Sequence, residues 1–217
     1  MTRPRLVRGG AGSGGASSGG AGRPPGGTPP GGEGGAGGGG GATAGPPQLV
    51  PGLDQEDERW MRMALDEAMR AAEEGEVPVG AIVVLEGRVL GRGHNRTEAT
   101  HDPTAHAEIL AIGAASTALG DWRLTNADIY VTLEPCAMCA GAIQLGRFRR
   151  VVFGPRDPKF GACGSILNVV EAPRLNHQVE VTEGVLAEES RFALRQFFRR
   201  LRQQGREVAP GDPFETE

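Results

Sequence analysis

Two short stretches decide the fold and the chemistry expected of this chain: His106-Ala107-Glu108 and Pro135-Cys136-Ala137-Met138-Cys139. Together they supply one imidazole, two thiols and one carboxylate. An imidazole and two thiolates suit Zn²⁺, and a site with three protein ligands leaves the fourth tetrahedral position open for water. We therefore interpret His106, Cys136 and Cys139 as zinc ligands and Glu108 as the group that moves protons on and off that water.

Each motif falls where a loop or strand is expected to enter a helix. The first N–H groups of a helix lack partners and carry positive potential, which lowers the pKa of thiols placed there. The three-residue spacing of Cys136 and Cys139 puts both sulfurs on one side of the first turn. Glu108 follows His106 by two residues, so both reach one site only if it lies off the helix end. The same geometry would aim the Ala107 N–H at an attacking oxygen.

Other interpretations explain less of the pattern. An isolated C-x-x-C also occurs in redox pairs, but a redox pair leaves His106 and Glu108 without a purpose. A closed structural zinc site would need a fourth ligand, for which Cys163 and His101 are the candidates. A non-catalytic, zinc-stabilised binding module does not explain Glu108. The combined pattern favours an open, hydrolytic site.

Glycine is distributed unevenly and divides the chain. Of its 36 glycines, 21 lie in residues 1–52, where Pro, Ser, Ala and Thr supply most of the rest. Such a segment buries too little apolar area to offset the entropy of ordering, so we predict that it is disordered. Residues 53–205 are long enough for one domain with one core, and residues 206–217 are predicted to form a flexible tail.

The localisation prediction rests on the same N-terminal segment. It carries four arginines and no acid before Glu33, a composition seen in organelle transit sequences, but it lacks amphipathic periodicity. The sequence has no secretory apolar region and no run of 18 apolar residues, so we expect a cytoplasmic protein without a membrane segment. Import through the N-terminal segment stays open.

The charge balance argues against a generic nucleic-acid coat. The first 52 residues carry four arginines and one acid, so the remainder carries a net charge of −7, against −4 for the whole chain. Nucleic acid would therefore have to bind a local basic patch. Two sets of basic residues are candidates: Arg191, Arg195, Arg199, Arg200, Arg202 and Arg206 near the C-terminus, and Arg147, Arg149, Arg150, Arg156 and Lys159 in the middle of the chain.

Hydrophobic periodicity and turn residues predict an α/β fold. Helices that alternate with strands imply a mostly parallel sheet covered on both faces, with one antiparallel pair from the first hairpin. The expected helices span Asp54 to Gly75, an N-cap at Thr104 to about Leu119, 136–145 and 187–203; the expected strands span 79–85, 88–93, 128–133, 151–153 and 179–181.

The joint pattern of H-x-E followed by P-C-x-x-C is the established signature of zinc nucleobase deaminases. The segments around it resemble the bacterial tRNA-specific adenosine deaminases, of the cytidine and deoxycytidylate deaminase superfamily. The matching stretches are residues 77–81, Asn95, residues 101–108, 130–142 and 151–168, within a resemblance that covers about 56–204. The leader and the tail have no counterpart in that family.

The resemblance implies a cytidine-deaminase-like, three-layer fold, with a five-stranded mixed sheet between helices. It implies one Zn²⁺ per subunit, a homodimer, and a tRNA anticodon stem-loop as the partner. The activity would be hydrolytic conversion of adenosine to inosine at the wobble position, with the arginine tRNA whose anticodon is ACG as the main substrate. An anticodon loop presents unstacked bases that enter a pocket at little unstacking cost, which supports such a substrate.

The resemblance also assigns substrate-binding residues. Asn95 would contact the target base, Val79 and Pro135 would help to form its pocket, and Asp157 and Lys159 would meet neighbouring nucleotides. In the last helix, Phe198, Arg199 and Arg202 would contact RNA. Simpler roles stay open: Asn95 as a turn residue, and the arginines as a solvated face near the negative end of a helix. The adjacent Phe197 and Phe198 point to different faces, so only one of them needs to be core.

A second substrate class is deamination of a free base or nucleotide, such as guanine, cytosine or deoxycytidylate. These enzymes share the zinc chemistry. Cytidine deaminases usually carry Cys at the position of His106, and a small-molecule enzyme has no use for an arginine-rich terminal helix. Both features favour the tRNA substrate.

Overall fold

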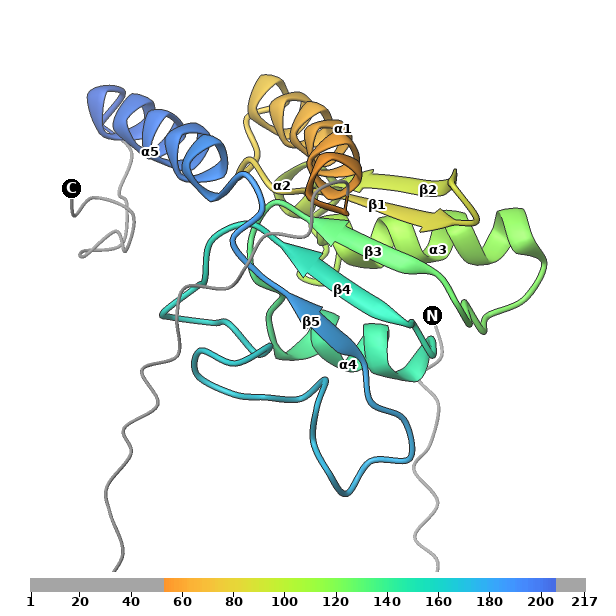
Figure 1. Cartoon of the computed structure of the whole chain (residues 1–217). Coiled ribbons are helices and arrows are strands. Elements are labelled where there is room, and N and C mark those ends of the chain that lie inside the picture. Colours follow the sequence, from red (N-terminus) through yellow and green to blue (C-terminus); the bar gives the residue numbers. More distant parts are fainter. Residues whose placement is uncertain (1–52, 206–217) are drawn as a thin grey trace, which may run out of the picture. The chain divides into compact units, whose positions relative to one another are not determined.

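The computed structural model describes residues 53–205, so the predictions of a disordered leader (1–52) and a flexible tail (206–217) lie outside the described residues. Five helices and five strands follow one another along this part of the chain (Figure 1). They are α1 (Leu53–Glu73), β1 (Gly80–Leu85), β2 (Arg88–His94), α2 (Thr97–Thr100), α3 (Ala107–Leu119), β3 (Asp128–Val131), α4 (Ala137–Leu145), β4 (Arg150–Phe153), β5 (Glu180–Thr182) and α5 (Ala187–Gln203).

The strands form one five-stranded mixed sheet in the order β2-β1-β3-β4-β5. β1 runs antiparallel to both β2 and β3, whereas β3–β4 and β4–β5 are parallel pairs. The expectation of a single antiparallel pair is therefore wrong. The hairpin places β2 at the sheet edge, and the connection through α3 runs from β2 past β1 to β3. β1 therefore lies between β2 and β3 and pairs antiparallel with each of them.

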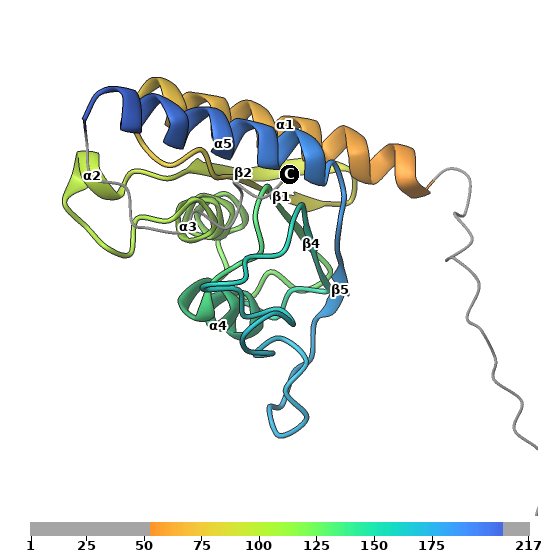
Figure 2. The same ribbon diagram turned by 90° about the vertical axis from the view of Figure 1, so that its left-hand side faces the viewer.

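Helices cover both faces of the sheet, as predicted (Figure 2). Alternate strand residues point to opposite faces, so each strand contributes to two cores. One core joins the sheet to α3 and α4, and the other joins it to α1. The strand residues of the first core are Ala81, Val83, Ile129, Val131, Val151 and Phe153; those of the second are Ile82, Val84, Tyr130 and Val152.

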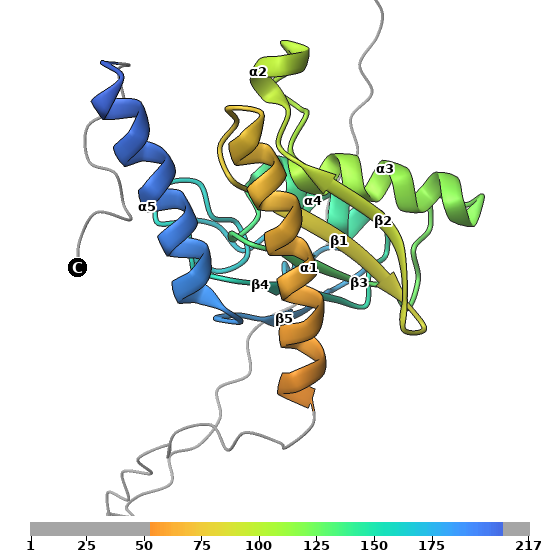
Figure 3. The ribbon, with the colours of Figure 1, turned by 90° about the horizontal axis from the view of Figure 1, so that it is seen from above.

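Helix α3 lies directly on the hairpin because β2 contains a glycine at the contact. A Cβ added at Gly91 would lie 2.2 Å from the Ala111 carbonyl oxygen of α3. On the opposite face, α1 and α5 run side by side, as Figure 3 shows from above. In the described residues, no helix has the length and apolar character needed to cross a membrane.

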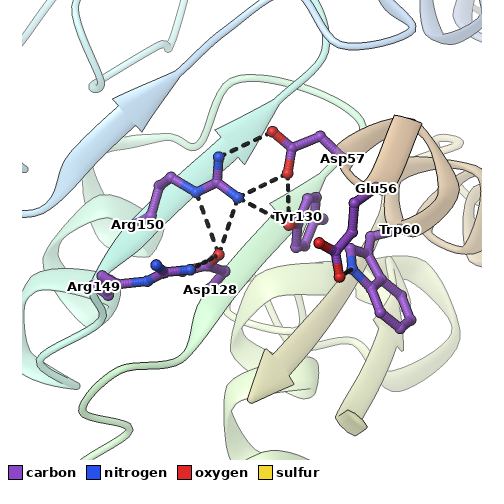
Figure 4. A network of polar contacts seen from close by, with 7 residues as sticks. All are labelled: Glu56, Asp57, Trp60, Asp128, Tyr130, Arg149 and Arg150. Atoms are coloured by element: carbon purple, nitrogen blue, oxygen red, sulfur yellow. Dashed lines mark hydrogen bonds and ion pairs between the residues drawn. The ribbon is translucent and has the colours of Figure 1, made fainter. Parts of the chain in front are cut away.

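A buried polar network connects α1 to the start of β3 and β4 (Figure 4). The Arg150 guanidinium donates to both carboxylate oxygens of Asp57, at 2.7 and 2.9 Å, and to Asp128 at 3.0 Å. The Tyr130 hydroxyl donates to Asp57 at 2.8 Å, and Arg149 Nε donates to Asp128 at 2.9 Å. The network fastens the first helix to the centre of the sheet.

The connection between β2 and α3 differs from its prediction. Asp102 Oδ1 accepts hydrogen bonds from both the backbone N–H and the hydroxyl of Thr104, at 2.8 and 2.7 Å. The Thr104 hydroxyl is therefore used within the loop, and α3 begins only at Ala107, with His106 as its N-cap. The predicted loop also contains the short helix α2, at whose start the Glu76 carboxylate accepts the N–H of Ala99 at 2.8 Å.

Candidate metal centre and substrate pocket

Three potential metal ligands converge at the starts of α3 and α4. His106 Nδ1 lies 3.5 Å from Cys139 Sγ and 3.7 Å from Cys136 Sγ, and all three ligand atoms lie within 4.8 Å of one another. Tetrahedral zinc with ordinary Zn–S and Zn–N bonds separates nitrogen from sulfur by about 3.6 Å. The spacing and chemistry of this donor set therefore fit Zn²⁺. Within residues 53–205, neither His101 nor Cys163 joins the group.

Two helix starts bring these side chains together. His106 is the N-cap of α3, with φ −76° and ψ 152°, and Cys136 is the N-cap of α4, with φ −71° and ψ 173°. Cys139 follows in the first turn of α4. Both helices pack on the same sheet face, so the positive ends of two helix dipoles meet at the sulfurs and favour thiolates. The predicted placement at helix starts is confirmed.

The surroundings of the cluster shift the pKa values of two neighbouring groups in opposite directions. The hydrogen bond with Cys139 and the contact with His106 lower the pKa of Cys136 to about 4 despite its partial burial. Glu108, the second residue of α3, is only 3% exposed, and burial raises its pKa to about 6. A thiolate and a carboxyl group that can take or release a proton therefore lie side by side.

The cluster opens into a cavity of about 670 Å³. Its lining includes three of the four candidate reactive residues and five of the residues that the sequence assigned to the substrate. The lining residues are Glu76, Val77, Val79, Asn95, Thr97, Glu98, His106, Glu108, Leu133, Glu134, Cys136, Asp157, Lys159, Phe160, Leu194 and Phe198. The predicted substrate residues Ala107, Pro135, Arg199 and Arg202 are not part of it.

The backbone N–H of Ala107 has a partner other than the one predicted. It donates to Asn95 Oδ1 at 3.0 Å, so it does not point at an attacking oxygen in this structure. Since Oδ1 accepts this bond, the amide orientation of Asn95 is set, and its Nδ2 group is the donor left for the pocket. Sequence reasoning missed this contact because the two residues lie 12 positions apart, on either side of a loop.

The segment after β4 forms part of the pocket wall. Asp157 Oδ1 accepts the backbone N–H groups of Lys159 and Phe160, at 2.8 and 3.2 Å, and so closes a tight turn. The turn presents Lys159 and the 71% exposed Phe160 at the pocket. Pro135 is buried below this wall, where its carbonyl accepts the Ala162 N–H at 2.9 Å. Asp157 therefore shapes the wall, while Lys159 is its cationic group.

Helix α5 contributes an apolar side to the pocket. Phe197 is buried, Phe198 lines the pocket, and their rings meet edge to face with centroids 5.5 Å apart. The prediction that the two adjacent rings have different environments is confirmed. Arg199 and Arg202 are exposed on the same helix. Phe198, Arg199 and Arg202 lie on a part of α5 that extends beyond the cavity.

Arginines of both predicted basic sets form ion pairs within the chain. In the middle set, Arg149 and Arg150 are bound in the network with Asp128, and Arg156 pairs with Glu183 at 2.7 Å. These arginines therefore do not form one open patch with Lys159. In the C-terminal set, Arg191 pairs with Glu188, and Arg206 lies outside the described residues. Charge counting along the chain could not show the pairings with Asp128 and Glu183, because those acids come from distant segments, whereas Glu188 lies only three residues before Arg191.

Sequence reasoning also missed several pocket residues, among them Glu76, Leu133, Glu134 and Leu194. Only Glu134 carried a local signal, because it precedes the Pro135-Cys136 motif directly. The others reach the pocket through the packing of separate elements.

Comparison with known proteins agrees with this geometry. A family model described as MafB19-like deaminase matches residues 55–202. The chain is 51% identical over 147 residues to the tRNA-specific adenosine deaminase of Bacillus subtilis (strain 168), across 68% of this chain and 91% of that protein. It is 50% identical over 143 residues to the protein of the same name from Agrobacterium fabrum (strain C58), across 66% and 94%.

A solved structure from a study of A-to-I editing by tRNA:A34 deaminases at the wobble position of transfer RNA also matches. It has a TM-score of 0.61 at 48% identity, and the match covers 63% of this chain and 99% of that one. The predicted cytidine-deaminase-like fold, a mixed five-stranded sheet between helices, is confirmed. The extent of identity to these relatives, together with the matched deaminase family model, shows that this chain belongs to the tRNA-specific adenosine deaminases.

Proposed function

We propose that this protein hydrolytically deaminates adenosine to inosine at the wobble position of a tRNA anticodon, with the arginine tRNA whose anticodon is ACG as its main substrate. The observation that carries the proposal is the His106–Cys136–Cys139 cluster, which opens together with Glu108 into a cavity of about 670 Å³. The relatives named tRNA-specific adenosine deaminase and the solved tRNA:A34 deaminase support the substrate.

We propose one Zn²⁺ per chain, held by His106, Cys136 and Cys139. When bound, zinc supplies Lewis-acid activation of water at this position. The spacing of the imidazole nitrogen and the two sulfurs supports this metal, as does the depressed pKa of Cys136.

Glu108 is the proton carrier in this proposal. Its carboxylate takes a proton from the water that adds to C6 of adenine. It then delivers a proton to the exocyclic nitrogen, which leaves as ammonia as the C6–N6 bond breaks. The products are inosine and ammonia, so one water is consumed and no redox partner is needed. Burial of Glu108 beside the cluster supports the role, because its carboxylate has little competing water.

Asn95 and the apolar lining would hold the base. The Asn95 Nδ2 group would donate to an acceptor nitrogen of the purine, since Oδ1 already accepts the Ala107 N–H, and Val79, Leu133 and Phe198 would offer apolar surface to its ring. We propose that Ala107 acts through Asn95 by fixing that orientation. Pro135 supports the wall from below.

The charge of the lining favours a base over a nucleotide phosphate. Among the lining residues that lie within 53–205, Lys159 is the only lysine or arginine, and these residues include the carboxylates of Glu76, Glu98 and Glu108. A phosphate inside this cavity would meet carboxylates with one cation to balance them. The phosphates of a bound RNA would instead lie outside, near Lys159 and the exposed Arg199 and Arg202 of α5. This argues for a flipped base of an RNA and against free deoxycytidylate.

The remaining assignments are proposed on family grounds. Asp157 and Lys159 would meet nucleotides beside the target, and Phe198 would stack on a base. The protein would act as a homodimer in the cytoplasm, where mature tRNA is available.

The test is incubation of the full chain with unmodified arginine tRNA, followed by reverse transcription and sequencing. Reverse transcription reads inosine as G, so editing appears as an A-to-G change at the wobble position. We expect complete A-to-I conversion there, read as G, and no change in the same tRNA carrying U at that position. Parallel reactions contain guanine, cytosine and deoxycytidylate, with ammonia release as the readout. Ammonia release from one of these without change in the tRNA would overturn the proposal in favour of a small-molecule deaminase.

A further inference from the structure

Glu134 is a buried carboxylate that the proposed reaction does not use. It is 3% exposed and lies two residues before the ligand Cys136. Its oxygens accept hydrogen bonds from the backbone N–H groups of Asp157 at 2.9 Å and of Cys163 and Ser165 at 3.0 Å each. The Ser165 hydroxyl is a fourth donor. All four donors belong to residues 157–165, which we call the wall loop.

The wall loop also approaches the backbone around Glu134. The Ala162 N–H donates to the Pro135 carbonyl at 2.9 Å, and Cys136 forms an antiparallel bridge with Gly161. A Cβ added at Gly161 would lie 2.3 Å from Glu134 Oε2, so only glycine permits this approach. Carboxylate and backbone together fasten the wall loop to the segment that leads into the metal ligands.

The same loop forms the outer wall of the substrate pocket. Its Asp157 turn carries Lys159 and Phe160, both of which line the cavity. One carboxylate therefore controls the spacing between two parts of the site: the start of α4, with Cys136, and the wall that faces the substrate. Glu134 itself touches the same cavity.

We propose that Glu134 is a positioning residue that holds the wall loop in its substrate-binding conformation. This inference rests on the proposed function and deepens it. The role requires a carboxylate, because two oxygens must accept from four donors. A glutamine would place an NH₂ group against N–H donors, and an aspartate would be one methylene too short to reach them. Loss of the carboxylate should loosen the wall loop while the metal ligands stay in place.

The variant Glu134→Gln tests the proposal, with Asp128→Asn as a matched control. Asp128 is an equally buried carboxylate at the opposite end of β3, with no contact to the pocket lining. We expect Glu134→Gln to raise KM for an arginine anticodon stem-loop about tenfold or more, with kcat within about threefold and one zinc per chain. Asp128→Asn should lower Tm without changing KM.

Amide hydrogen exchange gives a readout that does not depend on activity. In Glu134→Gln, the N–H groups of Asp157, Cys163 and Ser165 should exchange at least about tenfold faster, while those of α3 keep their protection. Ser165→Ala removes only the hydroxyl donor and should shift KM and exchange in the same direction by less. That variant keeps the proposal testable if Glu134→Gln fails to fold.

Two results would overturn the inference. One is an unchanged KM together with unchanged exchange in the wall loop. The other is loss of zinc with a fall in kcat at constant KM, which would make Glu134 a support of the metal ligands instead. Failure of the proposed function looks different, because the wild-type chain would then leave the stem-loop unedited while the exchange comparison still reports on the wall loop.

Discussion

The two ends of the central strands carry buried polar groups of opposite character. Where β3 and β4 begin, Arg150 sits between Asp57 and Asp128, and its charge is matched within hydrogen-bond distance (Figure 4). Beyond the other end of β3, Glu108 and the ligand cluster converge on a cavity. The polar groups around Arg150 are hydrogen-bonded to one another. Glu108 and the metal-ligand cluster instead face a cavity, where their polar atoms can bind a metal ion and a substrate.

This difference shows how burial can serve stability or chemistry. Breaking one partner of a matched buried pair leaves an uncompensated charge and destabilises the fold. Removing a side chain whose hydrogen-bonding or metal-binding atoms face a cavity costs little stability, because the partner of those atoms is a ligand and not another part of the chain. Four substitutions, two of them with matched controls, test this contrast.

The largest effect is expected at the cluster itself. Cys136→Ala should abolish deamination and reduce bound zinc to well below one per chain, because two ligands cannot hold the metal tightly. Metal analysis by mass spectrometry and the tRNA assay measure both effects. Cys163→Ala is the matched control, since Cys163 is buried nearby but lies outside the group. Undiminished zinc in Cys136→Ala would refute the ligand set.

The next largest effect is expected at Glu108. Glu108→Gln should lower the single-turnover rate by about 10³-fold, within the range for loss of a general acid and base. The amide keeps the shape of the side chain, so zinc content should stay at one per chain. Tm should stay equal or rise, because a buried carboxylate becomes neutral. Inosine formation at the wild-type rate, with zinc bound, would contradict the proton-carrier role.

The opposite end should respond through stability. Asp57→Asn leaves the Arg150 charge without half of its partners and should lower the free energy of unfolding by about 3 kcal/mol. Urea unfolding measures this loss. At a temperature where the variant is folded, kcat and KM should match those of the wild type. A changed KM with unchanged stability would mean that the two ends of the sheet are not independent.

The smallest of these effects is expected at Asn95. Asn95→Ala should raise KM about tenfold, because one hydrogen bond to the base is lost and the Ala107 N–H loses its acceptor. Asn95→Asp distinguishes the two roles of the amide: it keeps an oxygen for Ala107 but removes the Nδ2 donor. We expect Asn95→Asp to be no better than Asn95→Ala in the stem-loop assay. Recovery of a wild-type KM would assign Asn95 a purely structural role.

Much of the fold was predictable because its signals are local. Strand β1, with its run of β-branched residues, and helix α5 match their predicted ranges to within one residue. The separate environments of Phe197 and Phe198 follow from helix geometry alone. Thr104 is an instructive failure: its hydroxyl suits an N-cap, but Asp102 competes for it within the loop. Local competition of this kind depends on a conformation that propensity does not specify.

The sequence by itself determined the identity of the chemistry, since H-x-E and P-C-x-x-C name the donor atoms and their spacing fits two helix starts. Only the tertiary structure decided which partners those groups have. The antiparallel pairing of β1 with β3, the capture of the Ala107 N–H by Asn95 and the wrapping of the wall loop around Glu134 all join segments distant in sequence. Helix and strand periods repeat over a few residues and can be counted along a chain. The partner of a buried hydrogen-bonding group is chosen by packing, which brings together residues that no local pattern connects.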